Sequence, residues 1–98
     1  MKFKIENVRS NPTTVLRRAG YTFQHKLDNG EMSFIRPMAR GGYPRFHMYV
    51  RVDGVNMEIS FHLDQKRHTY GDETRHHGEY EESGALEEEA GRLKMFLR

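Results

Sequence analysis

The chain has 98 residues, of which 36% are hydrophobic and 31% are charged. This length suits a single domain, residues 1–98, with a small core and a heavily charged surface. It contains no cysteine, which excludes disulfides and thiolate chemistry, so any metal site must use histidine and carboxylate ligands.

The first half of the chain predicts three strands and one helix. Residues 2–7 alternate apolar and charged side chains, as a short strand does. Asn11-Pro12 is a typical helix start, and Gly20 suits the residue that ends a helix. Residues 21–27 and 31–36 form two strands joined by a tight turn, with His25 on the apolar side and half-buried. Residues 37–44 are rich in Gly and Pro and are expected to form a loop.

The next hairpin gives the strongest pattern in the chain. Apolar residues alternate with polar ones over residues 45–52 and again over residues 55–64. A two-residue turn at Asp53-Gly54 would place Val52 opposite Val55 and would fix the register of the whole hairpin. In that register the polar side pairs Arg45 with His62, and His47 with Ser60.

The last third combines a loop with a helix. Residues 65–83 show no period and are expected to form a long polar loop. Residues 86–97 place four apolar residues at helical spacing, and the triplet Glu87–Glu89 is expected to be solvated at the start of that helix. The order β-α-β-β-β-β-α predicts an α+β fold: a single two-layer domain with a mainly antiparallel sheet of four to five strands and two helices on one face. The architecture resembles small two-layer folds of the double-stranded-RNA-binding type.

The sheet face opposite the helices is the first candidate site. Arginine and aromatic side chains on a sheet face are what single-stranded nucleic acid requires, because phosphates pair with arginine and bases stack on rings. The predicted nucleic-acid contacts are Arg36, Arg40, Arg45, His47, Tyr49 and Arg51. The alternative is an ordinary solvated sheet face.

A metal or acid–base site is the second candidate. The spacing His62-x-Asp64 puts two ligands on one side of a strand end, and His76 with Glu79 from the loop would complete a site for Zn, Mn or Fe(II). Without a metal, His62 beside Asp64 would be an oriented general base, with Lys66 or Tyr70 near a substrate anion. The adjacent pair His76-His77 is more often solvated than ligating in a loop, and His68 and His77 are expected to be bystanders.

Two family resemblances accompany these patterns. The segment PTTVLRRAGYTFQHKLDNGEMSF resembles the opening of HicA-type ribonuclease toxins, which have a double-stranded-RNA-binding-like fold; their Gly-Ser-His pattern is replaced here by Gly30-Glu31-Met32-Ser33, which lacks the catalytic histidine. The motifs SFIRP, YPRFHMYV, HLDQK and HHGEY resemble a family of short uncharacterised bacterial proteins. That second resemblance points to Tyr43–His47, His62, Asp64, Lys66, Tyr70, His76, Glu79 and Tyr80.

The distribution of charge bears on these hypotheses. Residues 1–51 carry ten Lys/Arg against three Asp/Glu, whereas residues 52–98 carry six against eleven. Such asymmetry favours a basic face that attracts a polyanion, or two halves that neutralise each other. The leading hypothesis is a cytoplasmic protein that binds an anionic partner, with RNA favoured, and that does not enter a membrane. The runner-up is a metal-binding protein or metal-dependent enzyme, and the third is a homodimer that buries the polar face. Whether the chain is an enzyme stays open.

Overall fold

A computed structural model describes residues 1–65, 79–80 and 84–97. Within these residues the chain forms six strands and two helices. The elements are β1 (Lys2–Ile5), α1 (Pro12–Arg18), β2 (Thr22–Lys26), β3 (Met32–Pro37), β4 (Arg45–Asp53), β5 (Asn56–Asp64), β6 (Glu79–Tyr80) and α2 (Gly84–Phe96).

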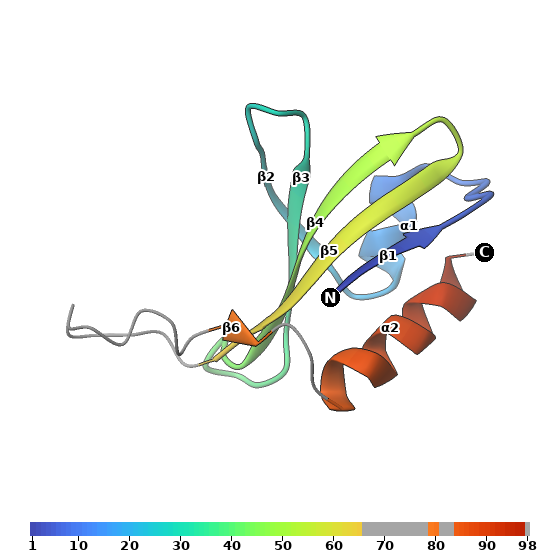
Figure 1. The fold of residues 1–98 in the computed structure, drawn as a ribbon. Coiled ribbons are helices and arrows are strands. Elements are labelled where there is room, and N and C mark those ends of the chain that lie inside the picture. Colours follow the sequence, from blue (N-terminus) through green and yellow to red (C-terminus); the bar gives the residue numbers. More distant parts are fainter. Residues whose placement is uncertain (66–78, 81–83, 98) are drawn as a thin grey trace.

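The strands form one antiparallel sheet in the order β1-β5-β4-β3-β2 (Figure 1). Strands β2 to β5 follow one another as hairpins, whereas β1 returns to the far side of β5. The short strand β6 also pairs with β5, at Leu63 and Asp64, beyond the part of β5 that β1 occupies. This strand lies inside the segment that was expected to be loop throughout. Its residues have no alternating pattern long enough to indicate a strand.

Both helices pack on the same face of the sheet, and the hydrophobic core lies between the two layers. Leu16 of α1 and Leu86 and Leu93 of α2 are fully buried against sheet residues such as Phe34 and Phe61. The apolar spacing predicted for the second helix is confirmed, since its four apolar positions are all buried. The predicted α+β fold, with two helices on one face of an antiparallel sheet, is confirmed.

The first helix is held by its two ends. The Asn11 side-chain oxygen accepts a hydrogen bond from the Thr14 backbone N–H at 3.1 Å, and Pro12 occupies the first helical position. After the helix, Gly20 has a φ of +102°, and a Cβ there would lie 3.1 Å from the Arg36 Nε. The backbone conformation therefore favours glycine, and any larger residue would also have to displace the Arg36 side chain slightly.

A buried charge cluster ties the second helix to the rest of the domain. Glu89 is only 6% exposed, so the prediction that the whole triplet is solvated is wrong at this residue. The Tyr21 hydroxyl donates to Glu89 Oε2 at 2.7 Å, and Arg92 donates to both carboxylate oxygens at 2.8 Å. Burial raises the pKa of Glu89, but the hydrogen bonds from Arg92 and Tyr21 outweigh burial and hold this pKa below its usual range. Burial, together with the Glu89 carboxylate, raises the pKa of the Tyr21 phenol.

The register of the β4–β5 hairpin differs from the predicted one by two residues. Asp53 pairs with Asn56, so the turn consists of Gly54 and Val55 rather than Asp53 and Gly54. Gly54 has a φ of +64°, which suits glycine at the first central position of a two-residue hairpin turn. A shift of two residues keeps every side chain on its predicted face but changes its partner across the strands. Consequently His47 lies opposite His62, and Arg45 lies opposite Asp64.

The prediction for His25 is also corrected. The pairing of β2 with β3 shifts between Phe23 and His25, which is a β-bulge. The bulge turns His25 onto the side of its partner Ser33, and His25 is exposed rather than half-buried.

Candidate functional site

The face of the sheet that points away from both helices carries polar side chains; we call it the polar face. It consists of Lys2, Lys4, Ser33, Arg45, His47, Tyr49, Arg51, Glu58, Ser60, His62 and Asp64. Strand alternation places these residues together, because partners in an antiparallel pair point to the same side. The predicted polar surface on β4 and β5 is therefore present.

A chain of hydrogen bonds crosses this face from β5 to β2. Asp64 Oδ2 accepts from Arg45 Nε at 3.1 Å and from His47 Nδ1 at 3.1 Å. His47 Nε2 lies 3.0 Å from Ser33 Oγ, and Ser33 Oγ lies 3.0 Å from Gln24 Oε1. Asp64, His47 and Ser33 are all buried, so each of these polar groups depends on the next for a partner.

The ionisation of Asp64 fixes the direction of the first bond. Burial raises the pKa of Asp64, but the hydrogen bonds from His47 and Arg45 outweigh burial and hold this pKa below its usual range. At neutral pH Asp64 is therefore a carboxylate, which only accepts, and His47 Nδ1 must carry a proton and donate it. At the other end of the chain, the Ser33 hydroxyl donates to Gln24 Oε1 and lies within hydrogen-bond distance of His47 Nε2.

The order serine, histidine, aspartate is that of a nucleophilic triad, but the arrangement does not suit that chemistry. Ser33 has no exposed surface and lies on an inner strand of the sheet. A nucleophile needs access to the substrate carbon at about 3 Å. The chain of hydrogen bonds therefore orients the His47 ring rather than activating the Ser33 hydroxyl.

The oriented imidazole supports a small cluster of rings. The centroid of the Tyr49 ring lies 4.7 Å from that of His47 and 5.7 Å from that of His62. These spacings lie within the range of favourable contacts between aromatic rings. Tyr49 is thereby held in place beside two imidazoles.

Two polar atoms next to this cluster lack a hydrogen-bond partner among the described residues. They are His62 Nδ1 and Asp64 Oδ1, and both are buried. A buried polar atom without a partner is rare and calls for a bound water, ion or other group. His62 and Asp64 are two residues apart on β5 and so point to the same side.

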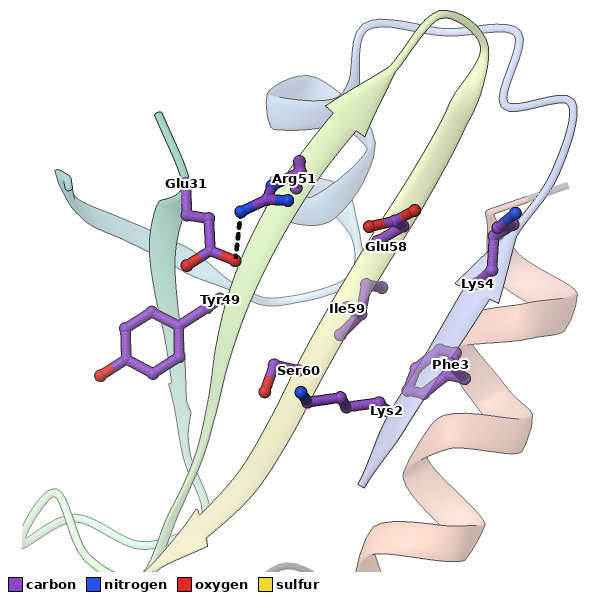
Figure 2. A pocket seen from close by; sticks show the side chains of 9 residues that line it. All are labelled: Lys2, Phe3, Lys4, Glu31, Tyr49, Arg51, Glu58, Ile59 and Ser60. Atoms are coloured by element: carbon purple, nitrogen blue, oxygen red, sulfur yellow. Dashed lines mark ion pairs between the residues drawn. The ribbon is translucent and has the colours of Figure 1, made fainter. Parts of the chain in front are cut away.

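A hollow of about 570 Å³ lies farther along the polar face, where β1, β5 and β4 meet. Figure 2 shows Lys2 and Lys4 on β1, Glu58 and Ser60 on β5, and Tyr49 and Arg51 on β4 around it. Arg51 Nη2 lies 3.7 Å from Glu31 Oε2, and both side chains are partly exposed. Neither lysine forms an ion pair with any residue that the structure describes.

The residues predicted to contact nucleic acid have different positions. His47, Tyr49 and Arg51 lie on the polar face as expected, and so does Arg45, although it is bound to Asp64. Arg36 lies on the opposite face, because it is two residues from Phe34 on the same strand and pairs with Phe46. Its Nη1 lies 3.4 Å from Glu89 Oε2. The placement of Arg36 on the polar face is therefore wrong.

Arg40, the last of the predicted nucleic-acid contacts, is exposed in the loop between β3 and β4.

Only some of the predicted metal ligands lie among the residues that the structure describes. His62 and Asp64 lie side by side on β5, and the β6 backbone at Glu79 pairs with that at Asp64. His76, Lys66 and Tyr70 lie outside the described residues. Within the described part of the chain, no group of three or more metal-ligating side chains converges.

Four residues of this region were missed by sequence reasoning. Gln24 and Ser33 extend the hydrogen-bond chain, and Lys2 and Lys4 line the hollow. The two lysines had a signal, since they alternate with Phe3 and Ile5, but nothing in the sequence placed β1 beside β5. Ser33 and Gln24 had no signal, because their roles depend on pairings between strands.

The chain matches no protein-family model, no curated protein and no solved structure. The two family resemblances noted above therefore stay predictions. Among the described helices, neither has the length and apolar character needed to cross a bilayer.

Proposed function

We propose that this protein binds an anionic polymer, with single-stranded RNA favoured, through the polar face. The observation that carries the proposal is the hollow beside β1, which is lined by Lys2 and Lys4 on one side and by Arg51 and the ring of Tyr49 on the other. Ammonium and guanidinium groups attract phosphates, and a tyrosine ring offers a surface on which an unpaired base stacks.

The size and chemistry of the hollow support a nucleotide as the bound unit. Its volume of about 570 Å³ falls within the range of small-ligand sites, about 300–1,000 Å³. Stacking on Tyr49 requires a base that is not already stacked in a duplex, which favours a single strand.

The buried hydrogen-bond chain has a supporting role in this proposal. It fixes the His47 ring, and the His47 ring packs against Tyr49. A stacking ring that is already held in place loses less conformational entropy on binding. In addition, Arg45 is held at 3.1 Å by a buried carboxylate, whereas Arg51 is 3.7 Å from Glu31 and its side chain is 53% exposed. Phosphate contacts are therefore assigned to Lys2, Lys4 and Arg51.

A salt titration of RNA binding tests the proposal. Fluorescence anisotropy with labelled oligouridylate should give an affinity that falls steeply with salt concentration. Lys2→Ala and Lys4→Ala should each reduce the magnitude of the salt slope by about 0.7, whereas Lys26→Ala on β2 serves as the matched control. Tyr49→Leu should weaken binding by about 1–3 kcal/mol at every salt concentration. A salt-independent affinity, or equal loss in the Lys26 control, would refute the proposal.

A divalent transition metal is the second candidate ligand, and the buried unpartnered atoms favour it. His62 Nδ1 and Asp64 Oδ1 are acceptors that suit Zn, Mn or Fe(II), while the other oxygen of Asp64 is held by His47 and Arg45. A carboxylate that gives one oxygen to a metal and the other to hydrogen-bond donors is typical of such sites.

Melting curves with and without a chelator test the metal hypothesis. Protein purified without a His-tag should melt higher with added ZnCl₂ or MnCl₂ and lower with the chelator. His62→Gln should abolish the difference, and His25→Gln, at an exposed histidine, should keep it. Identical melting temperatures in all three conditions would exclude metal binding at this pair.

A further inference from the structure

A second basic hollow lies on the other side of β1. It is lined by Lys4, Arg9 and Lys94, together with Ile5, Glu6 and Asn7. The hollow is therefore lined by three cationic side chains and by one carboxylate, that of Glu6. None of the three forms an ion pair within the part of the chain that the structure describes.

The backbone that carries Arg9 is anchored to the β4–β5 hairpin. Asn7 adopts a φ of +60°, which is uncommon for a residue other than glycine. Its N–H donates to the Asn56 side-chain oxygen at 3.3 Å, and the Val8 N–H donates to the Val55 carbonyl at 2.7 Å. The segment that leads to Arg9 is therefore held against the hairpin.

Lys94 is held from the helix side. Its Nζ lies 5.3 Å from the centroid of the Phe3 ring, which is a cation–π contact. This contact keeps the ammonium group beside β1 without neutralising its charge. An ammonium that packs on a ring remains able to bind an anion.

Lys4 lines both hollows and so connects them. We propose that the second hollow is a phosphate-binding subsite for the same RNA strand, which passes from the polar face across β1 to the end of α2. This inference rests on the proposed function and adds a direction and a minimum length to the bound strand. Charge complementarity selects an anionic ligand, because three cationic side chains outnumber the one carboxylate at the second hollow, that of Glu6.

The test compares short and long RNA on matched variants. Oligouridylates of about 4 and about 16 nucleotides span the range of site sizes known for single-strand binding domains. The double variant Arg9→Ala/Lys94→Ala removes two exposed cations of the second hollow, and Arg17→Ala/Arg18→Ala on α1 is the control. Circular dichroism melting checks that both variants fold as the wild type does.

The expected results separate the inference from the proposed function. Wild-type protein should bind the long RNA more tightly than the short one. The Arg9/Lys94 variant should bind the short RNA normally but lose on the order of tenfold for the long RNA at 0.1 M salt, with a salt slope smaller by about 1.4. Normal binding of the long RNA by this variant would overturn the subsite and leave the first hollow standing. Absence of binding to RNA of either length would overturn both.

Discussion

Replacing Asp64 with asparagine tests whether the buried hydrogen-bond chain holds the polar face together. Asparagine keeps the size of the side chain but removes the charge that two donors share. The side chains of Asp64 and Arg45 are only 12% and 21% exposed, so little water is available to replace the lost contacts. A hydrogen bond to a charged group contributes about 1.5–3 kcal/mol, and asparagine retains one oxygen acceptor. We therefore expect the free energy of unfolding to fall by about 2–4 kcal/mol.

Urea denaturation followed by circular dichroism measures this loss. In a domain of this size, each kcal/mol lowers the melting temperature by about 4–8 °C, so the variant should melt at least about 8 °C lower. Asp28→Asn, at an exposed turn residue, is the matched control and should change stability by less than about 0.5 kcal/mol. If Asp64→Asn were as stable as the control, the carboxylate would not be what organises Arg45 and His47.

The same pair of proteins has a diagnostic pH dependence. Because the pKa of Asp64 is lower in the folded state than in the unfolded state, its contribution to stability is complete above the unfolded pKa of about 3.9. That contribution is lost as the pH falls from there through the folded pKa. The stability gap between wild type and Asp64→Asn should thus be constant from pH 7 to pH 5 and should shrink below pH 4. A gap that does not change down to pH 2 would contradict the assignment of an ionised Asp64.

Three further changes test the parts of the fold that position this face. Glu89→Gln should lower the free energy of unfolding by about 2–4 kcal/mol, because it removes the buried charge to which Tyr21 and Arg92 donate, whereas Glu88→Gln should change little in the same urea titration. Ser33→Ala should cost about 1–3 kcal/mol by leaving a buried imidazole nitrogen unpaired, and the NMR chemical shifts of that ring should move. Leu93→Ala should cost about 2–5 kcal/mol by calorimetry, and an equal cost for Met95→Ala, at a residue 79% exposed, would contradict the placement of the core.

The sequence predicted the faces of the β4–β5 hairpin correctly but not its register. In the predicted register Val52 faces Val55 and Phe46 faces Phe61; in the observed one Val52 faces Met57 and Phe46 faces Leu63. Both registers pair apolar residues throughout, so apolar pairing cannot distinguish them. The turn cannot either, since Asp-Gly and a glycine-first turn are both suited to two-residue hairpins.

This two-residue difference decides what the polar face contains. In the predicted register His62 is the partner of Arg45, and Asp64 lies beyond the end of the hairpin. In the observed register Arg45 faces Asp64, and His47 faces His62. The hydrogen-bond chain exists because of that pairing, and it therefore lay beyond what alternation of residue types can reveal.

The wrong placement of Arg36 on the polar face has a different cause, because the alternation of residues along its strand already indicated the apolar face. Residues 32, 34 and 36 share one side of a strand, and Met32 and Phe34 were already assigned to the apolar side. Arg36 extends from that side to Glu89, which is itself buried among Tyr21 and Arg92. A charged residue on an apolar face indicates a buried partner, and Glu89 had been predicted to be one member of a solvated triplet.

For His25, no residue pattern in the sequence indicated the exposed position, since no glycine or proline marks the bulge that turns it outward.

Binding of the two candidate ligands would be coupled through Asp64, so the RNA and metal proposals are not exclusive alternatives. The charge of this carboxylate is already balanced by Arg45, so a divalent ion held by Asp64 Oδ1 and His62 Nδ1 would add positive charge to the polar face. Added positive charge there strengthens phosphate binding at the hollow beside β1. Thermodynamic linkage then requires RNA to raise the metal affinity by the same factor by which metal raises the RNA affinity. Measuring both factors on wild type and on His62→Gln distinguishes coupled from independent sites: coupled sites give a factor above one that the substitution returns to one, whereas independent sites give a factor of one in both proteins.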